Sequence, residues 1–115
     1  MQPARRKSAA DNSATVFAAL GDKRRLRLIT RLYRDGPASI TALASGSEVS
    51  RQATTKHLHV LARAGLVRAI RQGRETIYEP DPAQLHEATR HLESISRQWD
   101  QALARLKHLV EDENA

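Results

Sequence analysis

Apolar residues recur at helical spacing over most of the chain, and glycines and prolines divide the pattern into segments. In residues 13–20 the apolar side chains share one face, and Asp11 or Asn12 can cap the helix that this face indicates. Gly21 ends that helix. A second amphipathic helix follows and stops at the Gly36-Pro37 dipeptide. The pattern therefore predicts two consecutive helices at the start of the chain.

The middle of the chain has the pattern of a short helix, a turn and a longer helix. An extended piece over residues 38–40 leads to Thr41, which can cap the short helix, and residues 45–47 (Ser-Gly-Ser) predict a turn. Ser50 can cap a further helix over residues 51–64, which carries apolar residues along its inner side. A short helix, a tight turn and a second helix with polar residues at its start are typical of the helix-turn-helix motif.

Two β-prone runs and a long helix complete the pattern. Residues 66–71 and 75–78 flank a turn at Gln72-Gly73 and predict a hairpin. Asp81-Pro82 then begins a last helix, as cap and first-turn proline, and the helical pattern continues to about Glu111. The order of elements predicts a mainly α fold with a small β-hairpin, a winged helix-turn-helix in which the hairpin is the wing.

Apolar residues repeat every seven positions along the last helix, in two rows. The rows are Leu85, Leu92, Trp99 and Leu106, and Ala88, Ile95, Ala102 and Leu109. A helix of about 30 residues at ~1.5 Å per residue is ~45 Å long, which exceeds the width of a domain of this size. An amphipathic helix folded onto its own domain would show a similar stripe, but the length favours pairing with a second copy of the chain.

Composition narrows the class of protein. Hydrophobic residues make up 40% of the chain but aromatic residues only 3%, so Ala, Leu, Ile and Val must build the core, which favours packed helices. The chain has no cysteine, which excludes disulfides, thiolate–zinc sites and thiol redox chemistry. It has no run of 18 apolar residues and no apolar stretch after its first basic residues, so we expect a cytoplasmic protein with no membrane partner.

Charge is distributed unevenly along the chain. Residues 1–80 hold 15 Lys+Arg against 6 Asp+Glu, whereas residues 81–115 hold 4 against 7. An excess of positive charge such as that of residues 1–80 is typical of a protein that binds a polyanion. The expected organisation is a disordered basic arm (1–10), a winged helix-turn-helix domain (11–80), a dimerisation helix (81–112) and a tail (113–115).

The helix over residues 51–64 presents a polar stripe opposite its apolar side. The stripe consists of Arg51, Gln52, Thr55, Lys56 and His59. Arg and Lys can bond guanine, Gln can pair with an adenine edge, and a Thr methyl can contact the thymine methyl. Ser50 and the free N–H groups at the helix start can hold a phosphate. The solvated side of an ordinary helix would look similar, but the surrounding elements and the basic charge favour a helix that reads DNA.

The predicted wing tip carries two guanidinium groups, Arg71 and Arg74, on a tight turn. This arrangement suits contact with the DNA backbone or the minor groove. A polar turn without a partner is the alternative interpretation of the same residues.

Several segments resemble the ArsR/SmtB family of repressors: AALGDKRRLRLI (18–29), SRQATTKHLHVL (50–61), AGLV (64–67) and RQGRETIY (71–78). The resemblance covers about residues 13–85. It implies a homodimeric winged-helix DNA-binding protein, usually a repressor that blocks a promoter, and a dimer joined through the first and last helices. The expected DNA-binding residues are Ser50, Arg51, Gln52, Thr54, Thr55, Lys56, His57, His59, Arg71, Gln72, Gly73 and Arg74. The expected interface residues are Val16, Phe17, Leu20, Leu85, Ala88, Leu92, Ile95, Trp99, Ala102 and Leu106.

Within that set, the resemblance places Arg51, Gln52, Thr55 and Lys56 at the family's base-facing positions. His57 matches a histidine that is common in the family, and we assign it to packing or to a phosphate contact rather than to base reading.

Many relatives sense metals, but this chain lacks several of the residues that their sites require. The cysteine-based sites cannot form without cysteine. At the family's other site, on the last helix, Gln84 and Arg97 stand in two of the four ligand positions, and an arginine repels a cation. We therefore expect no metal and no cofactor, while a weak site from His86, His91 and His108 with neighbouring acids stays open. A small ligand, a protein partner or concentration alone could then control the protein.

No Gly-rich phosphate loop, nucleophile motif or paired carboxylates point to an enzyme. The sequence predicts a transcription regulator that binds double-stranded DNA sequence-specifically, as a homodimeric repressor on a palindromic promoter operator. Two alternatives stay open: a winged-helix module for protein–protein contact, and a metal-responsive repressor that uses His, Glu or Asp of the last helix. The basic residues Arg51 and Lys56 favour DNA over a protein partner.

Overall fold

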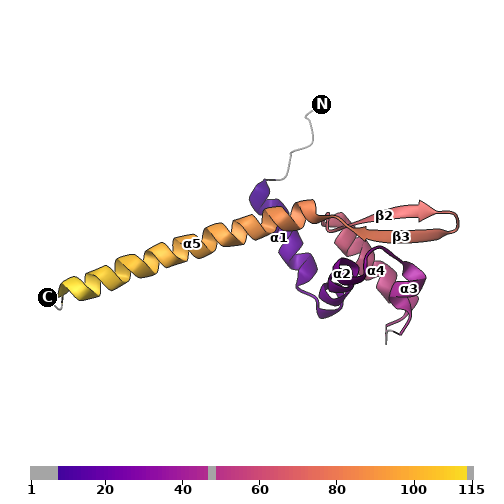
Figure 1. The fold of residues 1–115 in the computed structure, drawn as a ribbon, viewed down its shortest axis with the longest axis horizontal. Helices are drawn as coiled ribbons and strands as arrows, with labels where there is room; N and C mark the ends of the chain where they lie inside the picture. The colour runs from indigo at the N-terminus through magenta and orange to yellow at the C-terminus, as the bar shows by residue number, and fades with distance from the viewer. Residues whose placement is uncertain (1–7, 47–48, 114–115) are drawn as a thin grey trace, which may run out of the picture.

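The computed structural model describes residues 8–46 and 49–113 of the chain. Within these residues the predicted order of elements is confirmed, with five helices and three strands (Figure 1). The helices are α1 (Ala9–Leu20), α2 (Lys23–Asp35), α3 (Ile40–Ala44), α4 (Arg51–Arg63) and α5 (Pro82–Glu113). The strands are β1 (Ala38–Ser39), β2 (Val67–Gln72) and β3 (Glu75–Pro80).

An oxygen-bearing side chain accepts a backbone N–H at the start of each helix, because the first N–H groups of a helix have no partner within it. These residues are Ser8, Asp22, Ser39, Ser50 and Asp81. The predicted caps Ser50 and Asp81 are confirmed.

Two predicted caps are wrong. Ser8, not Asp11 or Asn12, caps α1: its hydroxyl accepts the Asp11 N–H, and the Asp11 carboxylate accepts the Ser8 N–H in return. The short helix is likewise capped by Ser39 and not by Thr41: the Ser39 hydroxyl accepts the N–H of Ala42, and the helix begins at Ile40. Helix α1 therefore overlaps the end of the predicted arm (1–10). Residues 1–7 of that arm, and the end of the predicted turn at 45–47, lie outside the described residues.

The strands form one antiparallel sheet in the order β1-β3-β2. The predicted hairpin is β2 and β3, and the extended piece expected over residues 38–40 is the two-residue strand β1, since Ile40 already begins α3. Ala38 pairs with Tyr78 and Ser39 with Ile77, a contact that the sequence pattern does not reveal. The base of the wing is thereby attached to the chain segment between α2 and α3.

The core lies between helices α1 to α4 and the base of the hairpin. Its largest fully buried side chains are Val16, Leu32, Leu43, Leu58, Leu61 and Leu66. Burial of a Val or Leu side chain contributes about 1.5–3 kcal/mol relative to leaving it in water. Leu58 and Leu61 both come from α4, so the apolar side of this helix is fixed against the rest of the domain, as the sequence pattern predicts.

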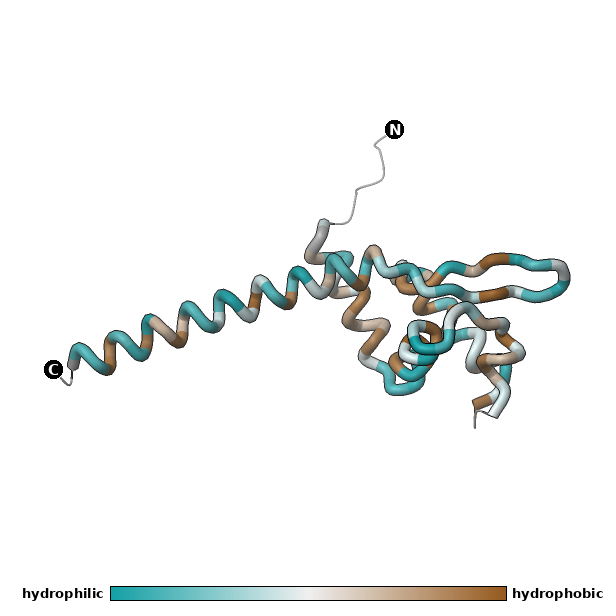
Figure 2. Tube along the Cα trace, viewed as in Figure 1, coloured by the Kyte–Doolittle hydropathy of each residue, from teal (hydrophilic) through white to brown (hydrophobic). Residues whose placement is uncertain are grey.

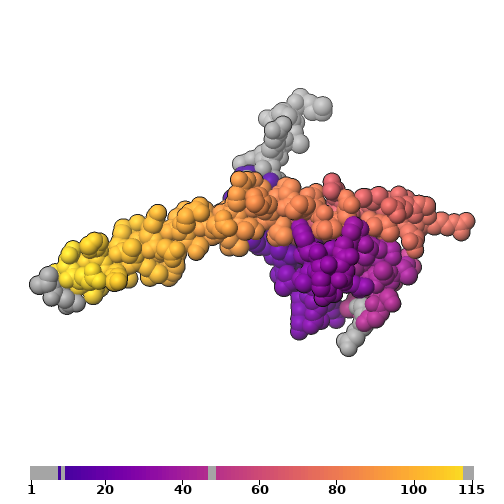
Figure 3. Space-filling model, viewed as in Figure 1, coloured from indigo at the N-terminus to yellow at the C-terminus, as the bar shows by residue number. Residues whose placement is uncertain are grey.

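Helix α5 begins on the domain and then leaves it (Figures 1 and 3). Its first turns pack on α1, where Ala88 is buried, while the large apolar residues from Leu92 onward are exposed. Apolar positions recur along the projecting part (Figure 2). The helix ends at Glu113, slightly beyond the predicted Glu111. None of the described helices combines the length and apolar character that a lipid-spanning segment needs.

We predict that Gly65→Ala destabilises the protein more than Gly73→Ala. Both glycines have positive φ, 77° and 60°, where a Cβ costs about 1–2 kcal/mol. At Gly65 the added Cβ would also lie 2.7 Å from Cγ of Gln84 on α5, whereas at Gly73 it would meet nothing within 4 Å. The extra loss in the free energy of unfolding should be about 1–3 kcal/mol, measured by urea denaturation at one protein concentration.

Gln84→Ala serves as the control, because it removes the atom that the new Cβ would strike. In the Gly65→Ala background it should recover the extra loss but not the part due to φ. Equal losses for the two glycine variants would mean that the contact between Gly65 and α5 has no energetic role.

Candidate nucleic-acid interface

Helix α4 has one side in the core and the opposite side in solvent. On the solvent side Arg51, Gln52, Lys56 and His59 are exposed and Thr55 is half-buried. The helix thus brings the predicted stripe together on one face, since residues three and four positions apart are neighbours there. The Thr55 hydroxyl donates to the carbonyl oxygen of Arg51 at 2.9 Å, so its proton is already used within the helix. The charged and amide groups of the other residues are the ones that can reach a base edge.

Two of the expected DNA-binding residues on α4 lie away from this stripe. Thr54 is only 3% exposed, and its hydroxyl donates to the carbonyl oxygen of Ser50 at 3.1 Å. Thr54 therefore belongs to the core and leaves the set of candidate DNA contacts. His57 is half-buried, and its Nδ1 lies 3.5 Å from Nη1 of Arg25 in α2. Of the two roles expected for His57, this position fits packing.

The start of α4 offers groups that can bind a phosphate. The exposed Ser50 accepts the N–H of Ala53 at 3.1 Å, which leaves the hydroxyl proton of Ser50 free to donate. The exposed guanidinium of Arg51 follows directly. A helix N-terminus with a hydroxyl and a guanidinium beside it is suited to an anionic oxygen.

Two arginines of α2 hold the neighbouring helices in position. Nε of Arg25 donates to the carbonyl oxygen of Ala19 at the end of α1, at 2.7 Å. Arg31 donates to the carbonyl oxygens of Ala42 and Leu43 near the end of α3, at 3.0 and 3.4 Å. Carbonyl groups at a helix C-terminus lack partners and attract cations. Sequence spacing gives no signal for these bonds, because the acceptors are backbone atoms of other helices.

Asp22 stands at the junction of α1 and α2. Its carboxylate accepts the N–H groups of Arg24 and Arg25, at 2.8 and 3.2 Å. The bond from the Arg25 N–H is the main cause that lowers the pKa of Asp22, and the charges of Arg25 and His57 act in the same direction. Because the pKa of Asp22 is lower in the folded state, its ionised carboxylate stabilises the fold at any pH above the usual pKa. This stabilisation is lost as the pH falls through the lowered pKa.

The wing carries the second group of expected DNA contacts. Arg71, Gln72, Gly73 and Arg74 are all exposed at its tip. Gln72 pairs with Glu75, so the two-residue loop is Gly73–Arg74 rather than the predicted Gln72-Gly73. The positive φ of Gly73 is typical of the first position in such a loop. Nε of Arg71 donates to the Gly73 carbonyl oxygen at 3.3 Å, which leaves Arg74 as the less constrained cation.

A second exposed surface runs along α5. Its large apolar residues are Leu92, Ile95, Trp99, Leu103, Leu106, Leu109 and Val110. Trp99 is 64% exposed. Four of the expected interface residues on α5 lie here, Ala102 is half-buried between them, and Phe17 of α1 is also exposed. Leu103 and Val110 widen this face, although they belong to neither of the two predicted seven-residue rows.

The other expected interface residues contribute to the protomer itself. Val16 and Ala88 are fully or almost fully buried, and Leu20 and Leu85 pack against the same core. The seven-residue pattern therefore combines two roles along one helix. Its first part attaches α5 to α1, and only the part from Leu92 onward is left uncovered.

No group of three or more His, Asp or Glu side chains is placed to hold a metal ion in residues 8–46 and 49–113. His86 and His108 are exposed on α5, and His91 is half-buried. A regulator that works without a metal stays a prediction.

The helix-turn-helix of α3 and α4, the adjoining hairpin and the polar outer face of α4 define a winged helix-turn-helix protein. A family model described as a helix-turn-helix domain matches residues 20–70. The chain is 35% identical over 98 residues to the HTH-type transcriptional regulator Rv2034 of Mycobacterium tuberculosis, a match that covers 85% of this chain and 88% of the relative.

Two solved structures extend the comparison. An ArsR-like transcriptional regulator from Rhodococcus sp. RHA1 is 42% identical with a TM-score of 0.75, over 85% of this chain and 92% of that chain. The homodimeric winged helix-turn-helix DNA-binding domain of a possible ArsR-family regulator from Mycobacterium bovis is 25% identical with a TM-score of 0.60, over 88% and 92% of the two chains. The chain belongs to the ArsR family of DNA-binding transcriptional regulators.

We predict that Arg74→Ala weakens binding to every duplex. If the wing tip lies on the DNA backbone, the slope of log affinity against log salt concentration should fall in magnitude by about 1. Fluorescence anisotropy of a labelled duplex over a salt series measures both effects. Arg90→Ala on α5 removes the same charge far from the wing and should change neither. An unchanged slope for Arg74→Ala would remove the wing tip from the interface.

Proposed function

We propose that this protein is a homodimeric repressor that reads a palindromic operator in duplex DNA. In this proposal α4 lies in the major groove and the wing lies along the adjacent backbone. The observation that carries it is the exposed polar face of α4, because Leu58 and Leu61 hold the other side of the helix in the core. A helix fixed in this way presents Arg51, Gln52 and Lys56 as a rigid set.

The chemistry of this face supports base reading rather than only non-specific attraction. A guanidinium can bond the two acceptors of guanine, and an amide can pair with the donor and acceptor of adenine. Arg51 and Gln52 stand in the first turn of α4, where recognition helices make most of their base contacts. Ser50 and Arg74 would hold phosphates on either side and so fix the register of the helix on the duplex.

The uncovered face of α5 supports a dimer. An exposed row of Leu, Ile, Trp and Val residues over several helical turns is typical of an interface rather than of a free surface. The Mycobacterium bovis neighbour is described as homodimeric. A two-fold dimer would present two copies of α4, which matches an operator made of two inverted half-sites about one helical turn apart.

Repression is the regulatory role that the family resemblance implies. A dimer that covers two half-sites within a promoter occupies the surface that the polymerase needs. A protein that acts on a promoter works where the chromosome is, so we place it in the cytoplasm.

The test begins with selection of bound duplexes from a random pool, which should yield an inverted repeat. On that duplex Arg51→Ala should cost about 1–3 kcal/mol and relax the base preference at one position of each half-site. The protein should lower transcription from a promoter that carries the repeat, and the variant should lose this effect. Arg97→Ala on α5 is the matched control and should keep both activities.

If Arg51→Ala lowers the affinity for all duplexes equally, Arg51 contacts a phosphate and not a base. Higher transcription on addition of the protein would contradict repression while leaving DNA binding in place.

We predict that Ile95→Asp converts the dimer to a monomer. The change puts an unpaired charge in an apolar interface, at a cost of about 3–5 kcal/mol, which raises the dimer dissociation constant by more than a hundredfold. Multi-angle light scattering during gel filtration measures the mass. Ala104→Asp, on the opposite side of the same helix, adds the same charge and should leave the dimer intact. A dimeric Ile95→Asp protein would show that α5 is not the interface.

A further inference from the structure

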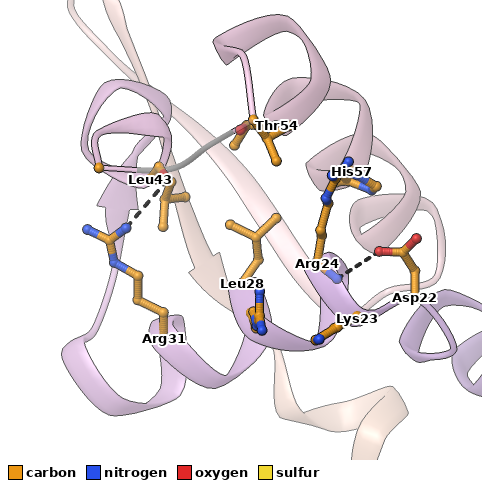
Figure 4. Close-up of a pocket in the computed structure, with 11 residues that line it drawn as sticks. Asp22, Lys23, Arg24, Leu28, Arg31, Leu43, Thr54 and His57 are labelled. Atoms are coloured by element: carbon orange, nitrogen blue, oxygen red, sulfur yellow. Dashed lines mark hydrogen bonds between the residues drawn. The ribbon is translucent and has the colours of Figure 1, made fainter.

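A basic groove lies behind the recognition helix, between α2 on one side and α3 and α4 on the other (Figure 4). Its charged lining comes mainly from α2 and consists of Lys23, Arg24, Arg27 and Arg31, with Asp22 as the only carboxylate among the lining residues that the structure describes. Leu28 and Leu43 form an apolar part of the wall, and Thr54 and His57 of α4 close the other side. The groove therefore combines a cluster of cations with an apolar surface.

Most of this positive charge has no ion-pair partner in the part of the chain that the structure describes. Lys23, Arg24 and Arg27 are exposed, and none of the three forms an ion pair with a carboxylate of the described residues. Arg31 is occupied with the carbonyl groups at the end of α3. The carboxylate of Asp22 accepts two backbone N–H groups at the start of α2. Lys23 and Arg27, four positions apart on one helix, repel each other, and an anion between them would relieve that repulsion.

The groove and the DNA-reading stripe lie on different sides of α4. His57, which lines the groove, is two residues from both Thr55 and His59, and this separation corresponds to about 160° around the helix axis. A duplex that contacts Thr55 and His59 therefore lies across α4 from the His57 side of the groove. This side of the groove favours a ligand smaller than DNA.

We propose that the groove binds a small organic anion and is the effector site of this regulator. Lys23, Arg24 and Arg27 hold its phosphate, carboxylate or sulfonate group, and its apolar part rests on the half-buried Leu28. The bound anion touches both α2 and α4 and reduces the positive potential around α4. It therefore lowers the affinity for DNA, and DNA lowers the affinity for the anion by the same factor. The regulatory part of this proposal rests on the proposed function, whereas anion binding does not.

The first experiment measures anion binding to the full chain without DNA. Phenyl phosphate is the probe in isothermal titration calorimetry, and inorganic phosphate is the comparison that lacks an apolar part. Phenyl phosphate should bind several-fold more tightly than inorganic phosphate. The double variant Lys23→Gln/Arg27→Gln should weaken its binding at least tenfold, while Arg34→Gln/Arg90→Gln, which removes two exposed cations outside the groove, should change it less than twofold. Circular dichroism checks that both variants fold.

No binding, or an equal loss in both double variants, would overturn the proposal. So would unchanged phenyl phosphate binding in Lys23→Gln/Arg27→Gln, because these cations would then not hold the anion.

The second experiment locates the bound phenyl phosphate by NMR, with two histidines of α4 as reporters. Phenyl phosphate should shift the ring proton NMR signals of His57, which lines the groove, and leave those of His59 on the outer face unchanged. A shift of His59 alone would put the anion on the DNA-reading face and overturn the proposal. Because neither experiment contains DNA, their outcome is separate from whether Arg51 reads an operator.

Discussion

Burial of one side of α4 is the constraint on which the rest of the structure depends. Leu58 and Leu61 are fully buried, together with Leu32 of α2 and Leu66 at the start of the hairpin. A helix of 3.6 residues per turn cannot rotate without pulling these side chains out of the core, so their burial decides which residues face outward. The positions of the exposed residues of α4 follow from the packing behind them.

The polar contacts around α4 reinforce this packing. Arg25 of α2 reaches the end of α1 and the edge of His57, and Arg31 reaches the end of α3. Helix α2 is thus bonded to each of the three helices around it. The two arginines use carbonyl groups that would otherwise lack partners inside the domain, so local helix ends and the placement of α4 are stabilised by the same bonds.

Much of the fold follows from local signals in the sequence. The caps Ser50 and Asp81, the glycines after α1 and α4 and the helical spacing of apolar residues give the order of elements and most of their bounds. The outward stripe of α4 follows from the same spacing. The first cap is misplaced because Asp11 is itself a good cap residue, and only its bond back to Ser8 shows that it stands in the third position of the helix.

Other features depend on contacts between distant segments, which no local pattern contains. Pairing of Ala38 with Tyr78 joins residues on either side of the helix-turn-helix. The burial of Thr54 depends on how closely the neighbouring helices approach α4, and a threonine is common on either side of a helix. The seven-residue rows of α5 are real, but Ala88 packs on the same chain and Ile95 does not. Sequence spacing reports that a face is apolar and does not say which surface covers it.

The wing and α5 are joined by one residue. Asp81 lies between the end of β3 and the start of α5, and its N–H donates to the carbonyl oxygen of Leu66 at 3.0 Å. Arg68 bridges Glu79 and Asp81 across the same junction. In the proposed dimer the distance between the two wings is therefore set by the angle at which the two α5 helices cross. Binding by such a dimer would depend on the spacing of the two half-sites as well as on their base sequence. Half-sites moved apart by half a helical turn would face opposite sides of the DNA, and only one of them could be occupied at a time.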